Sequence, residues 1–595
     1  MNEINRRLEL LRELMRREHL SAFIFPSTDA HQSEYVASHW QGRYWISGFC
    51  GSAGTAVVTL TSAALWTDSR YFLAAEEQLR DTEFQLMRLK IEGTPTIAEW
   101  LGRELAGVAS PEVGIDGWVN SYTTTISLKT ELQRAGGITL RTNLDPLELI
   151  WSDRPAIPDN PVEVQSLEYA GESAQAKIDR IRKALRGHHA DGILVSALDD
   201  IAWTLNLRGT DVHCNPVFVA YLLIASKQTT LFVDAKKLTP AVEAYLRNIN
   251  VGVKGYKDVE QALCHYPDYS ILMDADETNY HLWKKVKCNE IVAAKSPIPS
   301  MKAAKNETEI AGYRRAMLRD GVAMVKFLRW LGPAVAAGGE TEMSIDRKLT
   351  SLRAEQELFR DISFDTIAGY AAHGAIVHYE ATPATDAPLK PKGLLLLDSG
   401  AQYQDGTTDI TRTIPLGPLT DEMRHVYTLV LKAHIQLELV KFPDGASGTQ
   451  IDGIGRECLW REGYNFLHGT GHGVGSYLNV HEGPHQIRME WMPEPLKAGM
   501  TVTDEPGLYL ENKFGVRIEN TLLIKNYAVT EFGKFLQMEP LTLCPIATEP
   551  IETALLLPEE KEWLNEYHRT VRSKLSPLLG DDDKKWLEEA TKPIK

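Results

Sequence analysis

Residues 394–413 read LLLLDSGAQYQDGTTDITRT, and this stretch decides the fold of the domain that carries the candidate chemistry. Apolar segments on either side of Asp405-Gly406 predict two antiparallel strands joined by a tight turn. Asp398 ends a run of four leucines and Asp409 lies shortly after the turn, so we expect both carboxylates to be poorly solvated. A buried carboxylate must be paired, neutral or bound to a cation. A surface turn would explain Asp405 alone.

The length and composition predict a multi-domain globular chain. At 595 residues the chain is too long for one core and predicts about three domains. Hydrophobic residues make up 43% and charged residues 24%, as in soluble globular proteins. The net charge of -16 argues against a phosphate-binding surface, and no apolar run is long enough to span a bilayer. We therefore expect neither a nucleic-acid partner nor a membrane partner.

The N-terminal segment and the cysteines indicate a cytoplasmic protein. MNEINRRLELLRELMRREHL has the pattern of a charged amphipathic helix, without the apolar region and cleavage site of a signal peptide. The cysteines are scattered without CxxC spacing, which is typical of reduced thiols and not of a disulfide framework or a zinc knuckle. They are Cys50, Cys214, Cys264, Cys288, Cys458 and Cys544.

Residues 1–155 are predicted to form a first α/β domain. After the opening helix, SAFIF predicts a buried strand, and WISGFCGSAGTAVVTL followed by AALWTD predicts alternating strands and helices. Gly48, Gly51 and Gly54 fit neither GxGxxG nor a GK[ST] ending, so we interpret them as turn glycines and not as a phosphate loop. The proline-rich linker WSDRPAIPDNP follows.

Residues 156–303 are predicted to repeat this α/β plan. Both halves have the order helix, strand, loop, helix, glycine turn and two strands, the last of which ends in Asp. The same layout with weak sequence identity predicts a duplicated domain, and neither copy carries an evident catalytic cluster. After the linker SPIPSMKAAKN, Asn306 and Glu309 have capping-box spacing at the head of a long helix.

Residues 304–550 are predicted to form the catalytic domain. Helical stretches at 307–333 and 420–442 flank the paired strands, and a helix near 448–462 leads to FLHGTGHGVGSYLNVHEGPH. The glycines in that segment exclude an HExxH-type metal helix and predict a loop that packs closely around whatever the imidazoles face. Its histidines are His468, His472, His481 and His485.

Two glutamates complete a set of candidate metal ligands. In MTVTDEPGLYLENKFGVRIEN, Glu505 and Glu519 each close a predicted strand, with a glycine-containing turn between them. Carboxylates with one imidazole suit a pair of divalent cations such as Mn²⁺, Co²⁺, Fe²⁺ or Zn²⁺, and the lack of thiols argues against a structural zinc site. A two-residue loop at the predicted Asp-Gly turn would offset Asp398 from Asp409 along the strands, so we expect a bulge or a longer loop.

The chain resembles the methionine aminopeptidase and prolidase superfamily, whose catalytic domain has the pita-bread fold. The dinuclear metal ligands of that family match five residues in type, order and spacing: Asp398, Asp409, His472, Glu505 and Glu519. The resemblance to the long, three-domain, cytosolic-type aminopeptidase P group covers nearly the whole chain. It is carried by DAHQSEY, SGFCGSAGTA, WTDSRYF, NLRGTD, NPVF, HGAIVHYEAT, DSGAQYQDGTTDITRT, HGTGHGVGSYLNVHEGP and DEPGLYLENKFGVRIEN. It implies an α/β (α+β) chain with two creatinase-like N-terminal domains, a pita-bread catalytic domain, and a helical tail at 551–595.

The resemblance also implies a role for each ligand. Asp398 would bind one cation, His472 and Glu505 would bind the other, and Asp409 and Glu519 would bridge the two. Two cations that share a water lower its pKa, so hydroxide is available to attack a peptide carbonyl. Glu505 would also act as the proton shuttle.

Four further residues correspond to the family's substrate side. His378, His468 and His481 match the histidines that steady the scissile carbonyl and the tetrahedral intermediate. Arg517, two residues before Glu519, would orient groups at the site. Leu508 stands where we expect an aromatic residue, which would slightly alter the pocket.

The implied activity is the metal-dependent release of the first residue from peptides with proline in the second position. Mn²⁺ is the expected metal, with Zn²⁺, Co²⁺ or Fe²⁺ as alternatives, and the long forms of this family imply a cytoplasmic homodimer. A prolidase, which accepts only Xaa-Pro dipeptides, is the alternative enzyme, and the duplicated N-terminal half disfavours it. A metal-free creatinase-like hydrolase and a histone-chaperone peptide-binding module are disfavoured by the intact ligand set.

Overall fold

The computed structural model describes residues 2–595, which form two compact units. The first unit comprises the chain up to Gln165 together with Glu172–Ile298, and the second comprises Ser166–Gly171 and Pro299–Lys595. Among the described residues, no helix is both long enough and apolar enough to cross a membrane.

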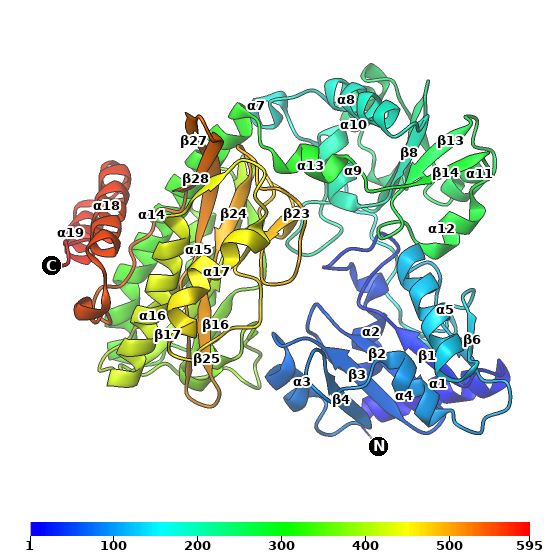
Figure 1. The fold of residues 1–595 in the computed structure, drawn as a ribbon, viewed down its shortest axis with the longest axis horizontal. Helices are drawn as coiled ribbons and strands as arrows, with labels where there is room; N and C mark the ends of the chain where they lie inside the picture. The colour runs from blue at the N-terminus through cyan, green and yellow to red at the C-terminus, as the bar shows by residue number, and fades with distance from the viewer. Residues whose placement is uncertain (1) are drawn as a thin grey trace. The chain divides into compact units, whose positions relative to one another are not determined.

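The first unit contains two six-stranded sheets of the same topology (Figure 1). Their strand orders are β4-β3-β2-β1-β5-β6 and β12-β11-β10-β8-β13-β14. In both sheets the successive neighbours are parallel, antiparallel, antiparallel, parallel and parallel. The predicted repeat of the N-terminal plan is therefore confirmed at the level of strand order and direction.

The elements of the first half are α1 (Glu3–Arg17), β1 (Ala22–Phe25), α2 (Gly42–Ser47), β2 (Thr55–Thr59), β3 (Ala63–Thr67), α3 (Phe72–Gln78), β4 (Phe84–Arg88), α4 (Ile97–Glu104), β5 (Glu112–Gly114), α5 (Tyr122–Gly136), β6 (Thr139–Arg141) and α6 (Leu147–Ile150). Those of the second half are β7 (Glu163–Val164), α8 (Ala174–Gly187), β8 (Gly192–Val195), α9 (Leu198–Leu205), β9 (Leu207–Arg208), β10 (Ala220–Ile224), β11 (Thr229–Val233), α10 (Pro240–Asn248), β12 (Val251–Lys254), α11 (Asp258–Cys264), β13 (Ser270–Met273), α12 (Tyr280–Lys285) and β14 (Glu290–Ala293). Gly48 ends α2 with a φ of 75°, as expected of a turn glycine.

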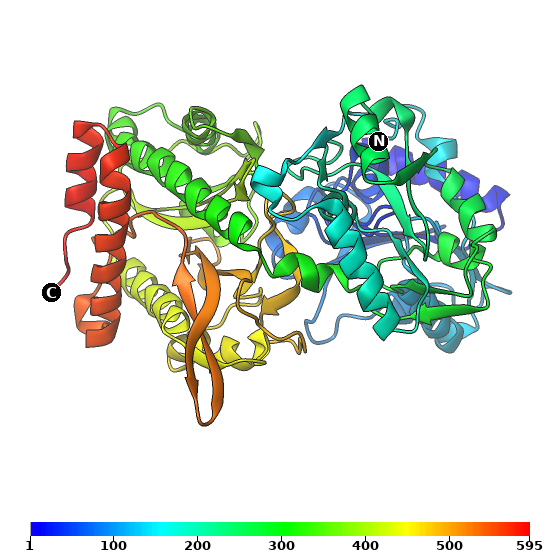
Figure 2. The ribbon, with the colours of Figure 1, turned by 90° about the horizontal axis from the view of Figure 1, so that it is seen from above.

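The second unit places helices on both sides of its strands, with α14 (Glu307–Ala337) on one side and α16 (Asp421–Glu438) on the other (Figure 2). The predicted capping box of Asn306 and Glu309 begins α14. Its other helices are α7 (Leu167–Ala170), α13 (Ile298–Ala303), α15 (Glu342–Ala354), α17 (Gly448–Trp460), α18 (Pro558–Leu575) and α19 (Asp581–Ala590).

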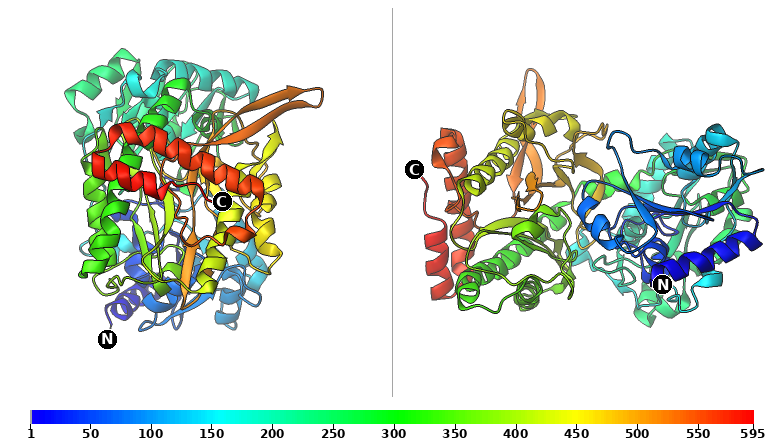
Figure 3. Two further views of the ribbon diagram at one scale, coloured as in Figure 1. Left: turned by 90° about the vertical axis from the view of Figure 1, so that its left-hand side faces the viewer. Right: turned by 90° about the horizontal axis from the view of Figure 1, so that it is seen from below.

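The strands of this unit form small sheets, among them β16-β17-β20, β15-β18-β19 and β21-β28-β27-β24. They are β15 (Phe359–Ile362), β16 (Ile367–Tyr370), β17 (Leu394–Ser399), β18 (Ala401–Tyr403), β19 (Gly406–Thr407), β20 (Ile410–Pro415), β21 (Lys441–Pro443), β22 (Gly471–Gly473), β23 (Glu482–Ile487), β24 (Thr501–Asp504), β25 (Gly507–Leu510), β26 (Phe514–Arg517), β27 (Asn520–Thr530) and β28 (Gly533–Pro540). The β27–β28 hairpin extends beyond the rest of its unit (Figure 3), and Phe532 near its tip is 84% exposed.

The turn of the 394–413 hairpin lies one residue earlier than predicted. Tyr403 pairs with Gly406, so the two-residue turn is Gln404-Asp405. The pairs from Asp398–Thr411 to Tyr403–Gly406 follow one register, so the expected bulge or longer loop was wrong. The earlier turn shortens the offset between Asp398 and Asp409 and makes a bulge unnecessary.

Contacts with α14 explain the position of this turn. The Asp405 carboxylate is buried and accepts hydrogen bonds from Arg315 Nε at 3.0 Å and Arg319 Nη1 at 2.8 Å. Because Asp405 is buried, this turn is not the solvated surface turn that is the simplest interpretation of the sequence. The turn is fixed instead by two arginines of a helix far away in the sequence.

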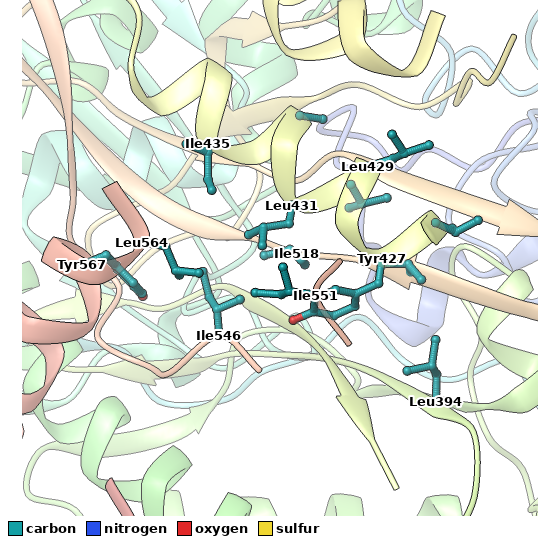
Figure 4. Packing of buried hydrophobic residues seen from close by; sticks show 14 of the residues in the cluster. Leu394, Tyr427, Leu429, Leu431, Ile435, Ile518, Ile546, Ile551, Leu564 and Tyr567 are labelled. Carbon is teal, nitrogen blue, oxygen red and sulfur yellow. The ribbon is translucent and has the colours of Figure 1, made fainter. Parts of the chain in front are cut away.

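The C-terminal tail forms helices that pack onto the rest of the second unit. Leu564 and Tyr567 of α18 belong to the same buried cluster as Leu431 and Ile435 of α16 (Figure 4). Burying a leucine side chain stabilises a fold by about 1.5–3 kcal/mol, so this amphipathic helix contributes to the stability of the unit. The helical apolar spacing predicted for the tail is confirmed.

Candidate metal centre

The 394–413 hairpin presents two carboxylates, one from β17 and one from the residue just before β20. Asp398 lies in β17 and pairs with Thr411 of β20, and Asp409 comes two residues before Thr411. Residues at such diagonal positions share one face of an antiparallel pair and lie within reach of one another. Asp398 is 7% exposed and Asp409 is 4% exposed, as their sequence context predicts.

Glycines allow the strand that carries His472 to approach its neighbours closely. His472 lies in β22, between Gly471 and Gly473, and not in a helix. A Cβ atom at Gly471 would clash with the carbonyl oxygen of Thr503, and one at Gly473 would clash with that of Glu482. The His472 backbone N–H donates to Thr503 Oγ1 at 3.1 Å, which fixes β22 beside β24.

The two glutamates reach the site from neighbouring strands. Glu505 directly follows β24, and Glu519 directly precedes β27. Because Asp504 pairs with Asn520 in the antiparallel ladder, the next residue of one strand lies beside the previous residue of the other. This pairing brings Glu505 and Glu519 together.

Distances between side-chain atoms show that these residues converge. His472 Nε2 lies 3.4 Å from Asp409 Oδ2 and 3.4 Å from Glu505 Oε1. Three potential ligand atoms lie within 4.8 Å of one another, one from each of Asp409, His472 and Glu519. Such spacing allows nitrogen and oxygen atoms to share a cation.

Asp398 is held by Arg517 through one of its two oxygens. Arg517 Nη2 donates to Asp398 Oδ2 at 2.7 Å, whereas Asp398 Oδ1 is buried without a hydrogen-bond partner. Thr411 Oγ1 donates to Glu519 Oε2 at 2.8 Å and accepts from Arg517 Nε at 3.1 Å. The unpaired Asp398 oxygen is the atom expected of a carboxylate that binds a cation, because a buried polar atom otherwise has a partner.

The electrostatics of the site also fit cation binding. Burial raises the pKa of Asp398 to about 6, although Arg517 opposes the shift. Burial and the neighbouring carboxylates raise the pKa of Glu505 and of Glu519. Burial alone would lower the pKa of His472, but Asp409 and Glu505 raise it to about 9. Divalent cations would take the place of the protons that these groups otherwise retain.

The residues that the sequence assigns to the substrate side differ in their distance from the proposed metal ligands and in their contacts. The rings of His481 and His472 lie edge to face, with centroids 4.4 Å apart, so His481 borders the metal ligands. His468 Nε2 contacts Tyr509 OH at 2.8 Å, and Arg517 Nη1 donates to that hydroxyl at 2.7 Å. His378 is half-buried in the segment that joins β16 to β17.

Two neighbouring residues are already engaged elsewhere. The Tyr379 side chain is buried, and its hydroxyl lies 2.9 Å from Glu342 Oε2 and 3.1 Å from Thr385 O, so its one hydrogen is used there. His485 is buried, with Nε2 2.7 Å from Thr501 O, and burial lowers its pKa to about 4.

Leu508 is 2% exposed and belongs to the hydrophobic core, so the expected change in the pocket was wrong.

Tyr509 is a site residue that the sequence analysis missed. Its hydroxyl lies between Arg517 and His468 and so connects Asp398 to the substrate side. The available signal was strand pairing, because Gly507 lies opposite Arg517 and a Cβ at Gly507 would clash with the Tyr509 hydroxyl. The glycine makes room for this contact.

A second buried cluster lies behind the ligands and consists of His434, Glu438 and Asp504. His434 Nδ1 is 3.1 Å from Asp504 Oδ2, and Nε2 is 3.2 Å from Glu438 Oε1. His434 Nδ1 also lies 3.2 Å from the Asp504 backbone oxygen, whereas both carboxylate oxygens of Asp504 are buried without a hydrogen-bond partner. One ligand atom from each of the three residues lies within 4.8 Å of the others, a spacing that could also hold an ion.

Comparison with known proteins gives the family of this chain. The metallopeptidase family M24 matches residues 311–526, and the C-terminal region of peptidase M24 matches 534–594. The creatinase/prolidase N-terminal domain matches twice, at 7–144 and 153–309, in agreement with the two sheets of the first unit. The chain belongs to metallopeptidase family M24.

Curated relatives and one solved structure match the chain along its whole length, and another solved structure matches part of it. A probable Xaa-Pro aminopeptidase P from Aspergillus niger is 39% identical over 100% of this chain and 99% of its own. A protein of the same name from Laccaria bicolor is 39% identical over 99% of this chain and 93% of its own. The crystal structure of an X-prolyl aminopeptidase from Caenorhabditis elegans, described as a cytosolic enzyme with a di-nuclear active site, has a TM-score of 0.96 and 35% identity, and covers 100% of both chains. An Xaa-Pro dipeptidase from Bacillus anthracis shares the fold, with a TM-score of 0.51 and 24% identity, over 63% of this chain and 99% of its own.

Proposed function

We propose that this protein is an Xaa-Pro aminopeptidase that hydrolyses the bond between the first residue of a peptide and a proline in the second position. The observation that carries the proposal is the convergence of Asp409, His472 and Glu519 beside Asp398, whose Oδ1 atom is buried without a partner. The full-length similarity to the di-nuclear enzyme from Caenorhabditis elegans supports it.

The proposed ligands hold two divalent cations. Asp398 would hold one cation, His472 and Glu505 would hold the other, and Asp409 and Glu519 would serve both. When bound, such a pair supplies a nucleophile at neutral pH and polarises the scissile carbonyl. Glu505 lies 3.4 Å from His472 and accepts from Thr503 Oγ1 at 3.3 Å, which holds its carboxylate in place to accept and return a proton.

The substrate side consists of His378, His468 and His481, with Arg517 orienting the site. His481 borders the metal ligands and is placed to donate to the oxygen that gains charge during attack. The Arg517–Tyr509 pair orients His468. Tyr379 and His485 are buried and hydrogen-bonded to other segments, so we assign neither of them to the substrate side.

Further parts of the proposal concern the metal, the assembly and the location. We propose Mn²⁺ as the metal, since a carboxylate-rich site with one imidazole suits it. We propose a homodimer in the cytoplasm, which six free cysteines and the cytosolic neighbour support. Domain boundaries near residues 155, 303 and 550 belong to the same proposal, and family matches that end at 144 and 309 support the first two.

One assay separates this function from that of a prolidase. Purified protein is given an Arg-Pro-Pro tripeptide and an Arg-Pro dipeptide, with and without a chelator. We expect release of arginine from the tripeptide, and loss of this activity with the chelator until Mn²⁺ is restored. Cleavage of the dipeptide alone would favour the prolidase, and chelator-resistant cleavage would contradict the metal mechanism.

A further inference from the structure

A fully buried carboxylate outside the metal centre organises the segment that carries His378. Glu342 is the first residue of α15, and its side chain is 0% exposed. Burial of a carboxylate is costly unless donors surround it, so its partners indicate what it holds together.

All four partners of this carboxylate come from one segment, between Tyr370 and Ala387. Oε1 accepts from the Tyr370 backbone N–H at 2.8 Å and lies 2.9 Å from His373 Nδ1. Oε2 accepts from the Tyr379 hydroxyl at 2.9 Å and from the Ala387 backbone N–H at 3.0 Å. These contacts hold the beginning, the middle and the end of the connection from β16 to β17.

Other contacts complete the attachment of this segment to the N-terminus of α15. The Glu342 backbone N–H donates to Ala387 O at 3.1 Å, and the Met343 N–H donates to Asp386 Oδ1 at 2.9 Å. The His373 ring stacks on the Tyr379 ring, with centroids 4.4 Å apart. His378 immediately precedes Tyr379 in the chain, so it is bonded directly to a residue whose side chain Glu342 contacts.

We propose that Glu342 is a positioning residue for His378, which acts on the substrate without Glu342 contacting it. This inference rests on the proposed function, because it assigns His378 to the substrate side. A glutamine amide cannot replace this carboxylate, because its NH₂ group is a donor and would face other donors. In one orientation these are Tyr379 OH and Ala387 N–H, and in the other Tyr370 N–H and His373.

The test is a double-mutant cycle with Glu342→Gln and His378→Ala. If Glu342 acts through His378, Glu342→Gln lowers kcat/KM for a Xaa-Pro tripeptide by about 10- to 100-fold in the wild-type background. In the His378→Ala background the same change lowers kcat/KM by less than about threefold, because coupled residues are not additive. Metal content per chain remains that of the wild type in both variants.

The matched control is Glu560→Gln in α18. Glu560 is also a buried carboxylate with several donors, including Lys432 Nζ at 2.7 Å and Leu557 N–H at 2.7 Å, but none belongs to the His378 segment. We expect this variant to retain its kcat/KM. Equal losses from Glu342→Gln in both backgrounds would overturn the proposal, as would an equal loss from Glu560→Gln.

Hydrogen exchange gives a readout that does not depend on activity. Glu342→Gln should increase exchange of the amides of residues 370–387, while the segments that carry the metal ligands keep their protection. Unchanged exchange in 370–387 would also overturn the proposal. Failure of the wild-type protein to cleave any Xaa-Pro peptide would instead refute the proposed function, so the two failures are distinguishable.

Discussion

Arg517 donates from Nη2 to Asp398 Oδ2 at 2.7 Å and so holds this carboxylate from the side opposite its unpaired oxygen. The same guanidinium donates to Tyr509 OH at 2.7 Å and to Thr411 Oγ1 at 3.1 Å. Because Thr411 in turn donates to Glu519, one arginine fixes the orientation of two proposed metal ligands and of Tyr509.

Arg517→Lys should reduce activity although it keeps the positive charge. An ammonium group cannot reproduce the fork of donors that reaches three separate acceptors. We expect kcat to fall by about 10- to 100-fold, the size expected when a hydrogen bond to a charged group is lost. Turnover is measured beside the control Arg314→Lys, whose exposed pair with Glu539 should be dispensable. Wild-type kcat in Arg517→Lys would contradict this role.

Replacing a bridging ligand by its amide should abolish activity. Asp409→Asn or Glu519→Gln removes a negative charge that both cations share, and an amide cannot compensate for it. Metal content per chain and turnover are both measured after saturation with Mn²⁺. Full activity with fewer than one bound metal per chain would exclude the two-metal mechanism.

His481→Ala should slow catalysis without removing metal. We expect kcat/KM to fall by about 100- to 1000-fold, as when a donor to the transition state is lost, with metal content unchanged. The control is His265→Ala, at an exposed histidine of the first unit. If the metal is lost together with the activity, His481 supports the ligands and does not handle the substrate.

Much of the site follows from local sequence patterns. The order of leucines and aspartates predicts that Asp398 lies buried at the end of a strand and that Asp409 lies buried close to the paired strand. The glycines around His472 predict that it does not lie in a helix. Both features depend on residues close together in the chain, so a sequence pattern reports them directly.

The features that were missed depend on contacts between distant segments. The turn at Gln404-Asp405 is set by arginines of α14. Spacing along one strand carries no information about a partner from another element. The location of Tyr509 between Arg517 and His468 has the same cause.

The protein should form a homodimer. Long-form members of the family that this chain resembles are expected to pair through the catalytic domain. Exposed apolar side chains are candidates for such a surface, among them Phe532, which is 84% exposed, and Trp491, which is 70% exposed. Sedimentation velocity at micromolar concentration should give the mass of two chains. A monomer under those conditions would contradict the prediction.

The central claim is that cleavage requires both a free N-terminus and a proline after it. A prolyl nitrogen carries no hydrogen and its ring fixes the backbone, so a site that selects proline differs from that of an ordinary aminopeptidase. The direct measurement is release of the first residue from Arg-Pro-Pro, Arg-Ala-Pro and N-acetyl-Arg-Pro-Pro by the Mn²⁺-loaded protein. We predict that only the unblocked Arg-Pro-Pro is cleaved. Equal turnover of Arg-Ala-Pro, or of the acetylated peptide, would contradict the account.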